Sequence, residues 1–121
     1  MEMKKVSAGG HEIAVVNSDE VLISDVQSAL DFMMTVKYET DCHQIVLNKK
    51  AVAEDFFDLR THIAGEILQK FVTYQFQIAI VGDFSGYTSK ALKDFIFESN
   101  KGRHIFFVPT EEEAIEKLSR A

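Results

Sequence analysis

The stretch QIAIVGDFSGYTSKALKDFIFESNKG, residues 77–102, predicts a buried strand, a tight turn and a helix that ends at a glycine. Residues 78–81 (IAIV) form an uninterrupted apolar run, which is typical of a parallel strand that helices cover on both faces. Gly82 lets the chain turn, and the polar residues after it can cap a helix that begins at Lys90. Apolar residues then recur at helical spacing, and Gly102 is expected to close the helix in the left-handed conformation.

Strand and helix patterns alternate along the whole chain. Ser24 with Gln27, and Thr110 with Glu113, have the spacing of helix capping boxes. Gly65 lies inside a predicted helix and indicates a close approach of that helix to the sheet. The predicted strands are 12–16, 44–47, 78–81 and 105–108, and the helices that follow them are 24–38, 53–74, 90–102 and 110–118. Right-handed crossovers then predict an α/β fold of four βα units, with a mostly parallel four-stranded sheet and helices packed on it.

Length and composition limit the class of protein. The 121 residues, 46% of them hydrophobic, fit a single domain over residues 1–121, and only the first few residues are expected to be disordered. A net charge of −6 without a cluster of Lys and Arg argues against a nucleic-acid-binding surface. No segment is long and apolar enough to cross a membrane, and the single cysteine, Cys42, excludes an intramolecular disulfide. These features predict a cytoplasmic protein.

Polar residues gather where the predicted parallel strands end, which is where open α/β sheets bind ligands. The backbone N–H groups of the turn from Gly82 to Lys90 could hold an anion at the start of a helix. The alternative, and commoner, role of Ser85, Thr88 and Ser89 is to cap that helix. The turn does not have the Gly-Lys-Ser/Thr order of a Walker A loop.

A second polar group lies in the segment predicted as the helix 53–74. If strands 44–47 and 78–81 are neighbours, this group shares a surface with the Gly82 turn, and acid–base chemistry could pair His62 with Asp83 or Asp58. The alternative is that the group faces solvent on an amphipathic helix. The candidate ligand-binding or partner-binding residues are Arg60, Thr61, His62, Asp83, Ser85 and Tyr87, and none is assigned a catalytic role.

The histidines do not predict a metal site. Cys42 and His43 are adjacent at the start of a strand, so their side chains point to opposite faces, and His62 has only Glu66 one helical turn away. The other two histidines precede strands, at the end of the sheet opposite the expected site. We predict no metal and no cofactor, and expect Cys42 to fill space in the core rather than act as a nucleophile.

A resemblance to a known family rests on three segments: DFFDLRTHIAGEILQKF (55–71), IAIVGDFSGYTSKALKDFIFESNKGR (78–103) and IFFVPTEEEAIEKL (105–118). They resemble an uncharacterised bacterial family, domain-of-unknown-function family 4180. The resemblance covers roughly the whole chain. It implies no established activity, so no catalytic residue carries over from it.

The order of elements also resembles the STAS domain of anti-sigma factor antagonists. In that domain a loop reading Asp-Ser-Ser-Gly-Leu-Gly precedes a long helix, and a partner kinase phosphorylates its second serine. The corresponding segment here is RTHIAG, residues 60–65. His62 takes the phosphorylated position, Thr61 precedes it as a hydroxyl acceptor, and Arg60 replaces the acidic residue. The resemblance implies a regulatory role.

Two classes of function remain. The leading hypothesis is a non-enzymatic regulatory or protein-interaction module of STAS-like fold, which binds a protein rather than nucleic acid or a membrane; self-association stays open. The alternative is a small ligand-binding protein or enzyme that uses the polar cluster at the carboxyl ends of the central strands. A pocket lined by that cluster would favour the alternative, whereas an exposed flat face bearing Phe84 and Tyr87 would favour partner binding.

Overall fold

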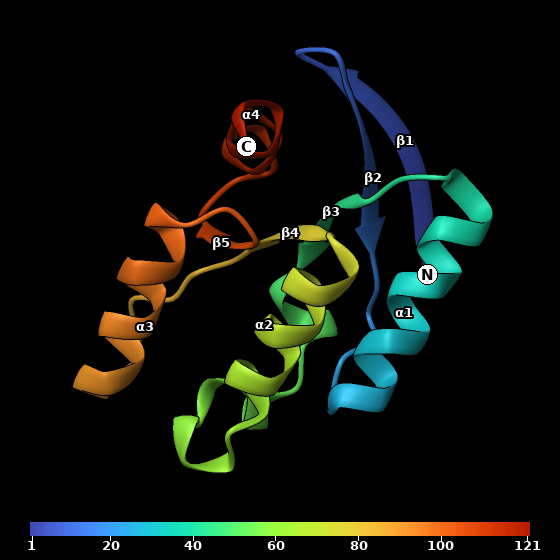
Figure 1. Ribbon diagram of the computed structural model, residues 1–121. Coiled ribbons are helices and arrows are strands. Elements are labelled where there is room, and N and C mark those ends of the chain that lie inside the picture. The colour runs from blue at the N-terminus through green and yellow to red at the C-terminus, as the bar shows by residue number, and fades with distance from the viewer.

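A five-stranded mixed sheet forms the centre of the protein, whose computed structural model describes residues 1–121 (Figure 1). The strands lie side by side in chain order; β1 is antiparallel to β2, and the remaining neighbours are parallel. Three short 3₁₀ turns, η1 (Lys49–Ala51), η2 (Glu54–Phe57) and η3 (Leu59–Thr61), connect β3 to α2. The strands are β1 (Glu2–Ala8), β2 (His11–Asn17), β3 (Gln44–Asn48), β4 (Gln77–Val81) and β5 (Ile105–Val108). The helices are α1 (Val26–Thr40), α2 (Ile63–Tyr74), α3 (Lys90–Lys101) and α4 (Glu111–Arg120).

The four predicted parallel strands are confirmed, but the sheet has a fifth strand that was not predicted. The first residues, expected to be disordered, form β1, which pairs with β2 along its whole length from Glu2 to Ala8. Gly9 and Gly10, with φ of 58° and 82°, make the tight turn of this hairpin. β1 was missed because it is an edge strand with lysines in its centre and lacks a buried apolar run.

The helices divide unequally between the two faces of the sheet. In Figure 1, α1, α2 and α3 lie along one face, and α4 lies apart from them. The larger core cluster joins side chains of α1, α2 and α3 to the sheet, with Phe71, Phe76 and Phe107 among its members. The smaller cluster joins Ala114 and Leu118 of α4 to the opposite face. Both faces are therefore covered, as the continuous apolar runs predicted.

The predicted helix starts are correct for α4 and one residue out for α1. Thr110 caps α4 by accepting a hydrogen bond from the Glu113 N–H. The cap of α1 is Asp25 rather than Ser24: its carboxylate accepts from the Ser28 N–H (2.8 Å), and Ser28 Oγ accepts from the Asp25 N–H (3.0 Å). None of the helices is long and apolar enough to span a membrane.

Three expectations for α2 and α3 are wrong. The predicted helix 53–74 begins only at Ile63, because His62 adopts a left-handed conformation (φ 64°) and 3₁₀ turns precede it. Gly65 does not approach the sheet: it is exposed, and a Cβ there would have no neighbour within 4 Å. Gly102 ends α3 with φ −87°, so it is not left-handed.

Candidate functional site

Polar side chains tie together the carboxyl ends of β2 and β3. The Asn48 carboxamide accepts from the Ser18 N–H (2.9 Å) and donates to the Ser18 carbonyl (2.8 Å). The side chain of the next residue, Lys49, passes over Gly82 at the end of β4. A Cβ added to Gly82 would lie only 2.6 Å from the Lys49 Cβ. Such a distance is too short for two carbon atoms, so glycine at position 82 is what lets Lys49 pass.

Lys49 ends in a cluster of aromatic and acidic groups. Its Nζ lies 5.2 Å from the centroid of Phe57, 5.0 Å from that of Tyr87, and 3.3 Å from Glu54 Oε1. The two rings stack with centroids 5.2 Å apart, and the Tyr87 hydroxyl donates to Glu54 Oε2 (3.0 Å). Burial disfavours the charged ammonium, but hydrogen bonding to Tyr87 and Glu54 outweighs it and raises the pKa of Lys49. Lys49 therefore stays charged and is unsuited to act as a base.

Asp83 is occupied within its own turn. Its Oδ1 accepts hydrogen bonds from the Ser85 N–H (2.9 Å) and the Ser85 hydroxyl (2.6 Å), which is the geometry of an Asx turn. These bonds lower the pKa of Asp83 below its ordinary value. The carboxylate is exposed but is not free of internal partners.

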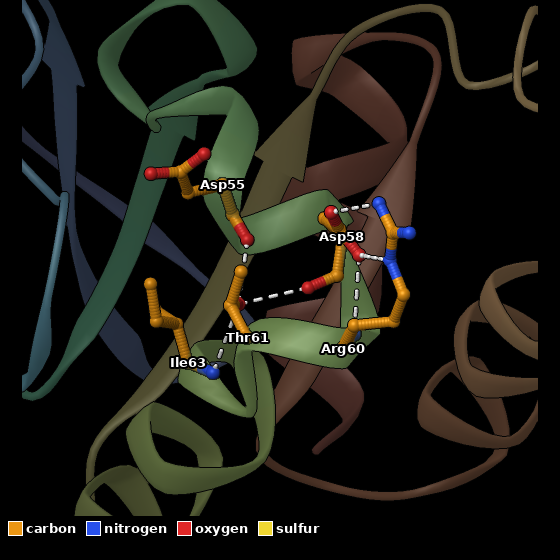
Figure 2. A network of polar contacts seen from close by, with 5 residues as sticks. All are labelled: Asp55, Asp58, Arg60, Thr61 and Ile63. Carbon is orange, nitrogen blue, oxygen red and sulfur yellow. Dashed lines mark hydrogen bonds and ion pairs between the residues drawn. The ribbon is translucent and has the colours of Figure 1, made fainter.

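Arg60 and Thr61 are held in a local polar network between η2 and α2 (Figure 2). The Asp58 carboxylate accepts from the Arg60 N–H (3.1 Å), Nε (2.9 Å) and Nη2 (2.8 Å), and this pairing lowers the pKa of Asp58. Thr61 Oγ1 lies 2.9 Å from the Asp55 carbonyl oxygen and 2.8 Å from that of Asp58, and accepts from the Ile63 N–H (3.3 Å). The network stabilises the entry to α2.

The two loops carrying the predicted site residues lie side by side, because β3 and β4 are neighbours as expected. The side chains that join them, however, are Glu54 and Phe57 with Tyr87. No hydrogen bond connects residues 60–62 with residues 83–87. Glu54 and Phe57 were not predicted, since they lay in a segment taken as helix; the only sequence signal for Lys49 was its position at the end of a strand.

His62 faces a different part of the surface. It lines a hollow of about 400 Å³ between α2 and α3 with Leu59, Gly65, Glu66 and Phe95. A second hollow of about 300 Å³ continues between the same helices and shares Phe95. Its other lining residues are Leu68, Val72, Glu98, Ser99, Gly102, Arg103, His104 and Ile105. These two hollows together are called the α2–α3 groove.

The two aromatic residues of the Gly82 turn are less exposed than a flat partner-binding face would need. Phe84 and Tyr87 are half-buried rather than exposed on a flat face, and Phe84 packs edge-on against Phe107 with centroids 5.3 Å apart. No group of three or more His, Cys, Asp or Glu side chains is placed to hold a metal ion. Cys42 is buried in the core, as predicted.

Comparison with known proteins places the chain in a family. No curated protein and no solved structure matches it. A family model described as a domain of unknown function, DUF4180, matches residues 8–118, which is nearly all of the chain: it includes β2 to β5, α1 to α3 and α4 as far as Leu118. The chain therefore belongs to the DUF4180 family.

Proposed function

We propose that this protein is a non-enzymatic regulatory module that binds a protein partner in the α2–α3 groove. The observation that carries the proposal is the position of Gly65, an exposed glycine inside α2 that lines the groove. A glycine inside a helix costs about 1 kcal/mol relative to alanine. Nothing within the chain requires that cost, since a Cβ at Gly65 would meet no atom within 4 Å and its φ is not positive.

A partner that packs closely against α2 would account for this glycine, because a position without a side chain lets another backbone approach. The groove also offers apolar surface. Phe95 lies in both of its halves, and Val72 on the α2 side is 42% exposed although it is a large hydrophobic residue. Glu66, Glu98 and Arg103 supply charges around this apolar surface. An apolar centre with a polar rim is the usual composition of a protein-binding surface.

The enzyme or small-ligand alternative has less support. Arg60, Thr61, Asp83 and Ser85 bond to groups in their own loops, and the Tyr87 hydroxyl donates to Glu54. A ligand that used Asp83 Oδ1, the Arg60 Nε and Nη2 groups or the Tyr87 proton would have to compete with those bonds. The geometry thus favours a structural role for these side chains over binding chemistry.

The likeness to the STAS domain is part of the proposal and is supported by the segment 60–65, which directly precedes and enters α2. Phosphorylation of Thr61 would end its donation to a main-chain carbonyl and place a dianion near Asp58. Leu59 and His62, which flank Thr61, line the groove. A phosphate on Thr61 would therefore alter the proposed binding surface.

Gly65→Leu tests the proposal by filling the groove. The tagged chain and the variant are used to capture proteins from a lysate of the source cell, and captured proteins are quantified by mass spectrometry. We expect Gly65→Leu to reduce capture of the specific partner at least tenfold while unfolding at the same or a higher urea concentration. The matched control is Gly86→Leu, since Gly86 is also exposed with no atom within 4 Å of a Cβ but lies in the β4–α3 loop. Equal capture by Gly65→Leu and the wild-type chain would reject the groove.

A further inference from the structure

β5 forms one edge of the sheet and has no strand on its outer side. It has four residues, all buried, so it is held by its side chains rather than by two neighbouring strands. The backbone polar groups of successive residues point alternately towards β4 and away from it. On the β4 side, the carbonyls of His104 and Val108 accept hydrogen bonds from the N–H groups of Ile78 and Gly82. Ile105 and Phe107 have the opposite orientation, so their N–H and carbonyl groups are the ones that a further strand would use. Phe107 lies nearest the centre of this short edge and is the residue that a side chain of the chain itself contacts.

A side chain of α3 occupies those two groups. Asn100 Oδ1 accepts from the Phe107 N–H (2.7 Å), and Asn100 Nδ2 donates to the Phe107 carbonyl (3.1 Å). In an antiparallel pair of strands, opposite residues exchange this same set of one N–H and one carbonyl bond. The carboxamide of Asn100 therefore stands where the backbone of a neighbouring strand residue would lie.

Two lysines lie along the same margin. Lys117 of α4 donates to the Asn100 carbonyl (3.2 Å) and lies 5.6 Å from the Phe106 ring centroid. Lys101 lies 4.1 Å from the ring centroid of Phe97, which is 60% exposed and one helical turn before Asn100. Both lysines also line a hollow of about 480 Å³ between α3, β5 and α4. Lysines placed over an edge are a common protection of exposed strands.

We propose that Asn100 closes the β5 edge against pairing with β5 of a second copy of this chain. A second copy is the partner that fits, because two identical edges related by a two-fold axis pair antiparallel, and Phe107 of each copy would exchange both of its hydrogen bonds with the other. Such pairing would also bring the two α3 helices together and cover Phe97, the exposed aromatic ring of this margin. Asn100 satisfies the Phe107 N–H and carbonyl within the chain, so association would gain nothing from that pair of hydrogen bonds.

The chain contains a matched control for this inference. Asn48 makes the same reciprocal pair of hydrogen bonds, with the N–H and carbonyl of Ser18, but it lies between β2 and β3, away from both edges. Replacing either asparagine by alanine removes one carboxamide and two hydrogen bonds. Only the change at position 100 exposes a strand edge.

The test is sedimentation velocity of the full chain, Asn100→Ala and Asn48→Ala over a hundredfold range of concentration. We expect the sedimenting mass of Asn100→Ala to rise with concentration from the 13.7 kDa monomer towards about twice that mass. The wild-type chain and Asn48→Ala should have the same mass as each other at every concentration. Association of Asn48→Ala to the same extent, or no concentration dependence for Asn100→Ala, would overturn the proposal.

A measurement on the wild-type chain covers the case in which Asn100→Ala does not fold. Amide hydrogen exchange should show Phe107 as strongly protected as Ile80 inside the sheet, although Phe107 faces the edge. Exchange of Phe107 at the rate of an exposed amide would mean that Asn100 does not close the edge, and would likewise reject the inference.

Discussion

At the scale of single residues, Gly82 and Lys49 show how one position depends on its neighbour in the sheet. Gly82 was predicted from its place after an apolar run, and it does follow β4. The reason for a glycine there is different from the one expected: its φ is not positive, and the missing Cβ makes room for the Lys49 side chain. That reason could not be read from sequence, because it depends on β3 and β4 being adjacent and in register.

Gly82→Ala is therefore expected to destabilise the protein by about 1–3 kcal/mol, the usual cost of overpacking. The new Cβ would lie 2.6 Å from Lys49 Cβ and 2.9 Å from Lys49 Cδ, so the lysine would have to leave its place beside Phe57 and Tyr87. Urea denaturation measures the change. Gly86→Ala, with open space around its Cβ, should change stability by less than about 0.5 kcal/mol. Equal stability of the two variants would show that Lys49 is not confined as described.

At the level of helices and strands, local sequence patterns predicted where each helix lies more accurately than where it begins. Thr110 was found because it is the one capping residue before α4, whereas Ser24 and Asp25 are adjacent and both suited to cap α1. The segment before α2 was predicted as helix from its apolar spacing. There Phe56 and Phe57 instead pack on the core against Phe107, with ring centroids 6.3 Å from it in each case, and tertiary packing overrides the local preference.

The cap of α1 predicts a dependence of stability on pH. Hydrogen bonding to Ser28 lowers the pKa of Asp25 below its ordinary value. The folded state therefore binds this proton less readily than the unfolded state, so the contribution is present above about pH 4 and is lost as the pH falls through the lowered pKa. Asparagine also caps a helix but does not titrate. Asp25→Asn should therefore lose less stability than the wild-type chain between about pH 5 and about pH 2, where the Asp25 carboxylate takes up its proton. Urea midpoints across this range test it, and parallel curves for the two chains would contradict it.

At the scale of the whole molecule, the apolar runs of β2 to β5 were enough to predict the parallel part of the sheet. β1 was not predictable in this way, since an edge strand needs only one neighbour and carries Lys4 and Lys5 at its centre. The α2–α3 groove was also beyond the sequence, because it depends on the spacing of two helices over the sheet. The contacts of the predicted site residues were beyond the sequence for the same reason: His62 lines this groove, whereas Asp83 and Ser85 bond to each other in a neighbouring loop, and their shared binding role stays a prediction.

Amide chemical shifts can show whether the α2–α3 groove is the surface that binds a protein partner. The ¹⁵N-labelled wild-type chain is titrated with the protein that it captures and Gly65→Leu does not. We expect the amide signals of Gly65, Leu68 and Phe95 to shift or broaden, while those of Asp83 and Ser85 stay in place. Shifts centred on Asp83, Ser85 and Tyr87, with Gly65 and Phe95 unchanged, would rule out binding in the groove and locate it at the carboxyl ends of the strands.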